Sequence, residues 1–159
     1  MIKALRVDHR LLHGQVAVSW TSQLGADCIL LASDTVMDDK FRLTSIKLAK
    51  PEGVKVVVKT VEEAIAALKS GVTDKYKLFI VCECIPDAER IARGVGIKTI
   101  NLGSTRPEEG KRAISKVVFI DDEDEERLNG MMDDGIAIGI QMIPTEKNIN
   151  CRDALKRKE

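Results

Sequence analysis

The sequence predicts an α/β protein whose mainly parallel sheet is covered by helices on both faces, a three-layer α/β/α arrangement. Strand-like and helix-like segments alternate along the whole chain of 159 residues. Two apolar runs, CILLA at 28–32 and LFIVC at 78–82, are continuous, as expected for strands that are buried on both faces. No repeat, linker or shift in composition interrupts the pattern, so we expect one domain over residues 1–159.

Local signals at the ends of segments place the elements in the first half of the chain. Gly25 suits the left-handed end of a helix, and Pro51 stops the helix that precedes it. Thr60 and Glu63 have the spacing of a capping box. The predicted elements are a strand over 2–7, a helix over 14–24, a strand over 28–32, a helix over 37–49, a strand over 54–59 and a helix from Thr60 to Ser70.

The second half of the chain continues the alternation. Pro86 lies near the start of a short helix, and the acidic run at 121–124 places negative charge at the positive end of another helix. Pro144 ends the last strand, and the tail after it is polar and charged with weak helical preference. The predicted elements are a strand over 78–82, a helix over 86–93, strands over 97–102 and 116–119, a helix that ends near Gly135 and a strand over 136–143.

Ligands of open parallel sheets bind beyond the carboxyl ends of the strands, where the direction of winding reverses. Four predicted loops lie at such ends: residues 8–14, 33–38, 83–87 and 101–110. We therefore expect the function of the protein to reside in these loops.

Composition excludes several classes of function. Lys+Arg and Asp+Glu both total 25 and aromatic residues make up 3%, which argues against binding nucleic acid. No apolar run approaches the roughly 18 residues that span a bilayer, and the charged N-terminus is unlike a signal peptide, so we expect a cytoplasmic protein. The cysteines lack metal-ligand and C-x-x-C spacing, and both nucleotide-binding glycine motifs are absent, so we expect neither metal nor cofactor.

The loop at 8–14 holds the most reactive set of side chains. It contains both histidines of the chain, and Gly14 follows His13 at the predicted start of a helix, where unpaired N–H groups favour anions. A neutral histidine is a competent nucleophile toward phosphorus, since its ordinary pKa is about 6.5. Arg10 can bind phosphate oxygens, and Asp8 can orient either Arg10 or the imidazole. His9 is expected to have a surface role.

The segment RVDHRLLHGQV at 6–16, with Trp20 downstream, resembles the N-terminal signature of the enzyme IIB components of the mannose/sorbose family. These proteins belong to the bacterial phosphoenolpyruvate-dependent sugar phosphotransferase system. The resemblance extends over essentially the whole chain, through the shorter motifs ASD at 32–34, NLG at 101–103, ISK at 114–116 and IPT at 143–145.

The resemblance implies a phosphoryl carrier and assigns its parts. His13 would accept a phosphoryl group from the phosphohistidine of a IIA partner, on the ring nitrogen nearer the side-chain stem. It would pass the group to a sugar held by a membrane-embedded IIC/IID pair, which would bring the protein transiently to the inner face of the membrane. Arg10 would bind the phosphoryl oxygens, Asp8 would orient the loop, and Gly14 and Gln15 would contribute backbone donors. The family fold places the first strand at the centre of the sheet, and the family's frequent dimers leave a homodimer open.

Two loops depart from the family pattern, ASDT at 32–35 and GSTR at 103–106, and we expect both to face the IIA, IIC or sugar side and to leave the transfer chemistry alone. Leu11 or Trp20 could contribute exposed apolar surface to a partner interface. Two alternative functions stay open. A phosphatase would use the same phosphohistidine as an intermediate, although that class favours Arg-His-Gly at the nucleophile. A ligand-binding or regulatory module would leave His13 inert.

Overall fold

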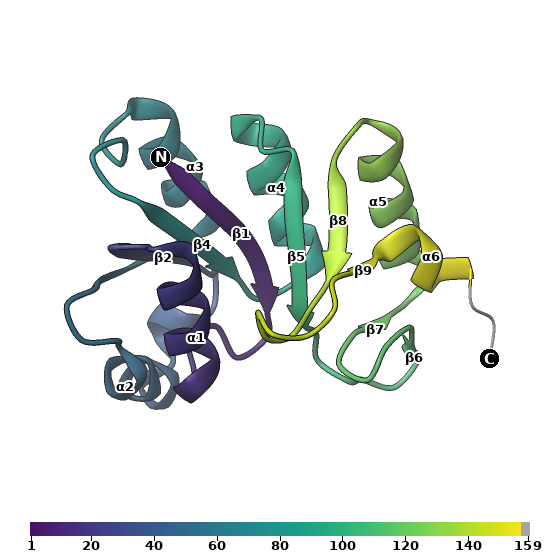
Figure 1. Ribbon diagram of the computed structural model, residues 1–159, viewed down its shortest axis with the longest axis horizontal. Helices are drawn as coiled ribbons and strands as arrows, with labels where there is room; N and C mark the ends of the chain where they lie inside the picture. Colours follow the sequence, from purple (N-terminus) through teal and green to yellow (C-terminus); the bar gives the residue numbers. More distant parts are fainter. Residues whose placement is uncertain (157–159) are drawn as a thin grey trace.

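The computed structural model describes residues 1–156 and has the predicted three layers (Figure 1). The strands of the main sheet are β1 (Ile2–Asp8), β2 (Cys28–Ala32), β3 (Lys55–Lys59), β4 (Leu78–Cys82), β5 (Thr99–Ser104), β8 (Ala137–Ile140) and β9 (Ile149–Asn150). The helices are α1 (Gly14–Leu24), α2 (Lys40–Ala49), α3 (Val61–Ser70), α4 (Ile85–Val95), α5 (Asp122–Asp133) and α6 (Cys151–Lys156), with a 3-10 turn η1 (Val36–Asp38). A separate hairpin pairs β6 (Arg112–Ala113) with β7 (Phe119–Ile120).

The strand order of the main sheet is β3-β2-β4-β1-β5-β8-β9, so β1 is central, as the resemblance implies. The pairs are parallel except that β9 runs antiparallel to β8. The chain leaves β1 toward β2 on one side, whereas it leaves the adjacent β5 toward β8 on the other. The carboxyl end of β1 therefore lies at a reversal of winding, where ligand sites of such sheets form.

The side chains of β2 show how the sheet is buried on both faces. Leu30 packs into the core formed with α3, α4 and α5, whereas its neighbours Ile29 and Leu31 pack into the core formed with α1 and α2. Successive residues of a strand point to opposite faces, so a continuous apolar run is needed at a position covered on both sides. The continuous runs that predicted buried strands are confirmed here and in β4.

The strand predicted over 116–119 is wrong for most of its length. Residues 116–118 belong to the bend between β6 and β7, and the pair lies outside the main sheet. The hydroxyl of Ser115 accepts hydrogen bonds from the N–H groups of Val117 and Val118. This side chain closes a local turn, which competes with extended pairing of the β-branched residues.

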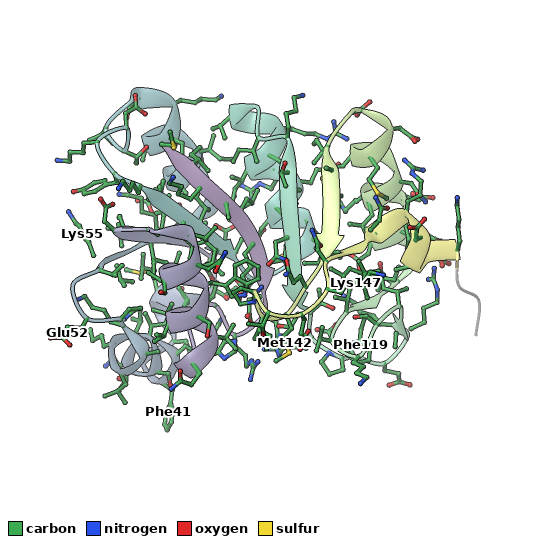
Figure 2. All side chains as sticks on the ribbon, in the orientation of Figure 1. Phe41, Glu52, Lys55, Phe119, Met142 and Lys147 are labelled. Atoms are coloured by element: carbon green, nitrogen blue, oxygen red, sulfur yellow. The ribbon has the colours of Figure 1, made fainter. Side chains whose placement is uncertain are left out.

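The strand predicted over 136–143 ends at Ile140, three residues early. The carbonyl oxygens of Gln141 and Met142 turn toward the guanidinium of Arg6 in β1 instead of joining a strand ladder. Met142 accordingly lies beside the carboxyl end of β1 (Figure 2). The early end of β8 is thus a consequence of the polar centre described below.

Two further boundaries differ from prediction. The helix predicted over 37–49 is divided into η1 and α2, because the side chain of Asp39 caps α2 by accepting from the N–H of Arg42. As far as Lys156 the tail is more ordered than its composition indicated, since it forms β9 and α6 and buries Cys151 and Ala154, while residues 157–159 of the tail lie outside the described residues. None of the helices within residues 1–156 is both long and apolar enough to cross a membrane.

Candidate functional site

The loop after β1 is held by its own apolar side chains. The N–H of Leu11 donates to the carbonyl oxygen of Asp8 at 2.9 Å, and Leu11 has a φ of 61°. Left-handed backbone is costly for leucine, and the burial of Leu11 and Leu12, each 3% exposed, stabilises it.

The expectation that Leu11 or Trp20 is exposed is wrong, since both are buried. The most exposed large hydrophobic side chain in the described part of the chain is Phe41 on α2, at 87% (Figure 2).

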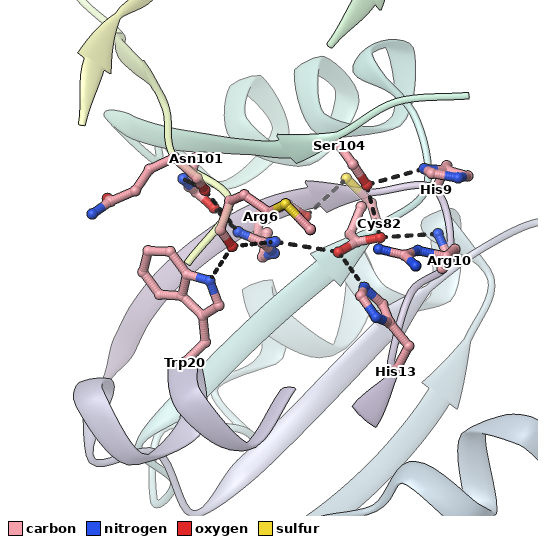
Figure 3. A network of polar contacts seen from close by, with 11 residues as sticks. Arg6, His9, Arg10, His13, Trp20, Cys82, Asn101 and Ser104 are labelled. Carbon is pink, nitrogen blue, oxygen red and sulfur yellow. Dashed lines mark hydrogen bonds and ion pairs between the residues drawn. The ribbon is translucent and has the colours of Figure 1, made fainter. Parts of the chain in front are cut away.

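The carboxylate of Asp8 is the centre of the site, where the side chains of Arg6, His13 and Ser104, labelled in Figure 3, meet. Its Oδ2 atom lies 2.9 Å from Nε2 of His13 and 3.3 Å from Nη2 of Arg6. Its Oδ1 atom accepts from the backbone N–H of Arg10 at 3.0 Å and from the hydroxyl of Ser104 at 3.0 Å. Asp8 is 1% exposed, so these four donors replace the water that an ionised carboxylate requires.

These donors decide the charge of Asp8. Burial alone raises the pKa of its carboxyl group, but the hydrogen bond from His13 and the charge of Arg6 outweigh burial and lower the pKa to about 2. Asp8 is therefore ionised at neutral pH. Of the two side chains that Asp8 is predicted to orient, it contacts the imidazole of His13, whereas its contact with Arg10 is made to the backbone and not to the guanidinium.

Arg6 is a residue of the site to which the sequence assigned no role. Its buried guanidinium donates to the side chain of Asn101 in β5 and to the two carbonyl oxygens after β8, and it lies 5.1 Å from the ring centroid of Trp20. A Cβ atom at Gly103 would collide with this guanidinium, which would have to shift away from its present partners. The sequence did contain a signal for a buried, paired Arg6, because an arginine lies between apolar neighbours in this predicted strand.

Replacing Arg6 with methionine is expected to lower the free energy of unfolding by about 3–5 kcal/mol, because it leaves the Asp8 carboxylate buried without its permanent charge partner. Arg152→Met is the matched control. It breaks an ion pair with Asp133 between exposed side chains and is expected to cost under about 1 kcal/mol. Urea unfolding of both variants measures the difference, and equal losses would contradict a buried structural role for Arg6.

His13 is presented with one ring nitrogen engaged and one free. It is the extended residue before α1, with φ −150° and ψ 129°, and its side chain is 22% exposed. Because Asp8 is ionised, Nε2 of His13 carries a hydrogen and donates it to Oδ2. Nδ1 has no hydrogen-bond partner within residues 1–156, so it is the ring nitrogen whose lone pair is free.

The start of α1 beside His13 is suited to an anion. No side chain caps this helix end, and the N–H groups of Gly14 and Gln15 donate to no group of the described chain. Gly14 has a φ of 41°, a conformation that favours glycine. The side chain of Arg10 is exposed and makes no hydrogen bond or ion pair in residues 1–156. The residues predicted for phosphate binding thus offer donors that make no hydrogen bond within residues 1–156.

His9 does not have the surface role predicted for it. It is half-buried, and its Nδ1 atom lies 3.0 Å from the hydroxyl of Ser104, which also donates to Asp8 (Figure 3). Burial lowers the pKa of His9, while the charge of Asp8 opposes that shift. The loop at Ser104, which is expected to face partner or sugar, also donates a hydrogen bond to the same Asp8 carboxylate that accepts from His13.

The four predicted loops do meet at the carboxyl edge of the sheet. They line a cleft of about 600 Å³ that includes His9, Thr35, Glu83 and Arg106. Within it, Glu83 accepts from the hydroxyls of Ser33 and Thr35 and pairs with Arg42. Asp34, in a loop that is expected to face a partner, is exposed and accepts a hydrogen bond from the N–H of Val61 at the start of α3.

The whole chain is similar to one family of known proteins. The family model described as "PTS system sorbose subfamily IIB component" matches residues 2–159. N-acetylgalactosamine-specific phosphotransferase enzyme IIB component 2 of Escherichia coli (strain K12) is 31% identical over 146 residues, covering 91% of this chain and 92% of that protein.

Two further likenesses concern a longer protein and a solved structure. The PTS system mannose-specific EIIAB component of Escherichia coli (strain K12) is 27% identical over 158 residues, which cover 99% of this chain and 49% of that protein. The crystal structure of the IIBSor domain of the sorbose permease from Klebsiella pneumoniae superimposes with a TM-score of 0.93 at 27% identity, covering 100% of this chain and 98% of that one.

Proposed function

Because the chain belongs to the sorbose-subfamily IIB components of the sugar phosphotransferase system, we propose that His13 is its phosphoryl carrier. The observation that carries the proposal is the hydrogen bond of 2.9 Å between Nε2 of His13 and the buried carboxylate of Asp8. It leaves Nδ1, the nitrogen nearer the side-chain stem, as the nucleophile. The same bond stabilises the positive charge that the ring acquires when Nδ1 forms a bond to phosphorus.

The transfer has two steps. In the first, the lone pair of Nδ1 attacks phosphorus, the P–N bond to the donor histidine breaks, and its electron pair returns to the donor ring. In the second, the oxygen of a sugar hydroxyl attacks phosphorus, the P–N bond to His13 breaks with return of its electron pair to Nδ1, and the hydroxyl proton passes to water. Asp8 remains ionised throughout, since its pKa of about 2 lies far below neutral pH.

The surroundings of His13 supply hydrogen-bond donors and one positive charge for the oxygens of a phosphoryl group in both steps. The N–H groups of Gly14 and Gln15 at the start of α1 and the guanidinium of Arg10 have no partners within residues 1–156. We assign all three to the phosphoryl oxygens, which need several donors at once. The site needs no cofactor for this reaction, because the bond that breaks is already activated in the phosphohistidine donor.

The partners follow from the family. The mannose-specific relative is named as an EIIAB component, and this chain matches about half of it. We propose that a separate IIA protein or domain donates the phosphoryl group, and that a membrane IIC/IID pair presents the sugar at the inner face of the membrane. Residues 1–159 would then act as one IIB domain that carries the group between them.

Reconstitution tests the proposal. The purified protein is incubated with phosphoenolpyruvate, the general phosphocarriers and a matched IIA protein, and phosphoryl adduct and free phosphate are both measured. A carrier forms an adduct that is labile in acid and stable in base, with little free phosphate. Continuous release of free phosphate would instead support a phosphatase, and absence of an adduct would support an inert module.

Arg10→Ala is expected to keep the fold and to slow phosphoryl transfer from IIA about 10²-fold, because it removes one charged donor from the moving phosphoryl group. Arg10→Lys should recover part of the loss, since a lysine replaces the charge but not the planar pair of donors. Rapid-quench measurement of adduct formation gives the rates, with Arg152→Ala on α6 as the control. A wild-type rate in Arg10→Ala would make Arg10 an ordinary surface residue.

A further inference from the structure

The two histidines of the chain are connected through one carboxylate. Oδ2 of Asp8 accepts from His13, while Oδ1 accepts from the hydroxyl of Ser104, which lies 3.0 Å from Nδ1 of His9. His9, Asp8 and His13 come from the end of β1 and the loop after it, whereas Ser104 is the last residue of β5. The contacts run from His9 through Ser104 and Asp8 to His13, and Figure 3 shows the labelled His9, Ser104 and His13 of this series.

The hydrogen-bond directions in this connection are determined. The hydroxyl of Ser104 has one hydrogen, and the ionised carboxylate of Asp8 can only accept. Ser104 therefore donates to Asp8 and must accept from His9, so Nδ1 of His9 carries a hydrogen. The two histidines have opposite tautomers as a result, with the hydrogen on Nδ1 in His9 and on Nε2 in His13.

We propose that Ser104 and His9 are positioning residues for phosphoryl transfer, because they hold the Asp8 carboxylate in the orientation that keeps Nδ1 of His13 free. The inference rests on the proposed role of His13. Neither residue needs to touch the phosphoryl group: Ser104 is 4% exposed and its single hydrogen is already used. Their effect passes through Asp8. Besides the hydroxyl of Ser104, Oδ1 of Asp8 accepts a hydrogen bond from the backbone N–H of Arg10.

The reason for an effect on His13 is the geometry of a carboxylate. With Ser104 removed, Oδ1 keeps one donor, and the group can rotate about its Cβ–Cγ bond so that Oδ2 leaves the line of the Nε2–H group. The tautomer of His13 with hydrogen on Nδ1 then gains population, and that form has no free lone pair at Nδ1. Removal of His9 shifts the tautomer of His13 in the same direction but by less, since it removes only the hydrogen bond that holds the hydroxyl of Ser104.

Four variants test this connection. Ser104→Ala removes the hydroxyl, and His9→Ala removes the donor to it. His9→Asn keeps a donor, because the side-chain amide nitrogen of asparagine can occupy the place of Nδ1, but it has no titratable ring. Ser45→Ala is the control, since Ser45 is exposed on α2 and makes no side-chain hydrogen bond in the described part of the chain.

The tautomer of His13 is read by ¹⁵N NMR of the unphosphorylated protein, and the rate of transfer from phospho-IIA is measured separately. We expect Ser104→Ala to raise the Nδ1–H population of His13 and to slow transfer about tenfold, as for lost partners of other oriented histidines. His9→Ala should slow transfer severalfold, and His9→Asn should restore most of that loss. The His9 variants change a half-buried side chain and so test the connection without altering the core.

An unchanged tautomer and rate in Ser104→Ala would overturn the positioning role of Ser104. His9→Asn as slow as His9→Ala would overturn hydrogen-bond donation as the role of His9. Failure of the proposed function is a different result, namely no adduct on His13 in the wild-type protein, and it leaves the tautomer measurement interpretable because that is made before phosphorylation.

Discussion

Replacing His13 with alanine is expected to abolish the acid-labile, base-stable phosphoryl adduct completely. The chain contains two histidines, and only His13 lies at the uncapped start of α1. Alanine leaves the loop anchors Leu11 and Leu12 in place, and the removed ring is partly exposed, so the fold should persist. The measurement is adduct formation from phosphoenolpyruvate through the general phosphocarriers and IIA, with circular dichroism to confirm folding.

The second histidine supplies the control for this result. His9→Asn leaves His13 as the single histidine of the chain, and the adduct should still form. An adduct that persisted in His13→Ala would place the phosphoryl group on His9 or on another kind of side chain, and the carrier account of the loop would be wrong.

Asp8→Asn is expected to slow phosphoryl transfer to His13 by about 10³–10⁴-fold. An asparagine amide can present its N–H₂ group to Nε2, which would reverse the tautomer and put the hydrogen on Nδ1, the nitrogen that must attack. The corresponding change in the triad of a serine protease costs about 10⁴-fold for the same reason. Single-turnover rates with phospho-IIA measure the effect, and a loss below tenfold would show that Asp8 does not set the tautomer.

The stability advantage of the wild-type protein over Asp8→Asn is expected to depend on pH. The pKa of Asp8 is about 2 in the folded protein, below the ordinary value of 3.8 that applies when the chain is unfolded. A lowered folded pKa gives stability that is present above pH 4 and is lost as the pH falls toward 2, here roughly 2 kcal/mol. The difference in unfolding free energy between wild type and Asp8→Asn should shrink by that amount over this range in urea titrations, and a constant difference would contradict the assigned charge.

The fold could be predicted because its signals are local. Continuous apolar runs identified β2 and β4, and the cap at Thr60 with Glu63 located the start of α3 correctly. The end of the last strand was predicted wrongly because a side chain far away in the sequence forms hydrogen bonds with its backbone. The predicted last strand stopped at Ile140 because Arg6, more than a hundred residues earlier, takes the carbonyl oxygens of Gln141 and Met142.

The site could be predicted only in part for the same reason. Asp8 ends β1, and Arg10 and His13 lie in the short loop that follows it, so their proximity is visible in the sequence. Ser104 reaches Asp8 only because β5 lies beside β1, a pairing of strands that are far apart in the chain. Leu11 was misplaced because its left-handed backbone turns the side chain into the core, which no period of apolar residues reveals.

The most direct test of the account is the position of phosphorus on the ring. Protein labelled with ¹⁵N in its histidines is phosphorylated through IIA, and the coupling between ³¹P and ring nitrogen is recorded by NMR. The account predicts coupling to Nδ1 of His13, with Nε2 of the same ring still protonated and bonded to Asp8. Coupling to Nε2 of His13, or to either nitrogen of His9, would contradict it.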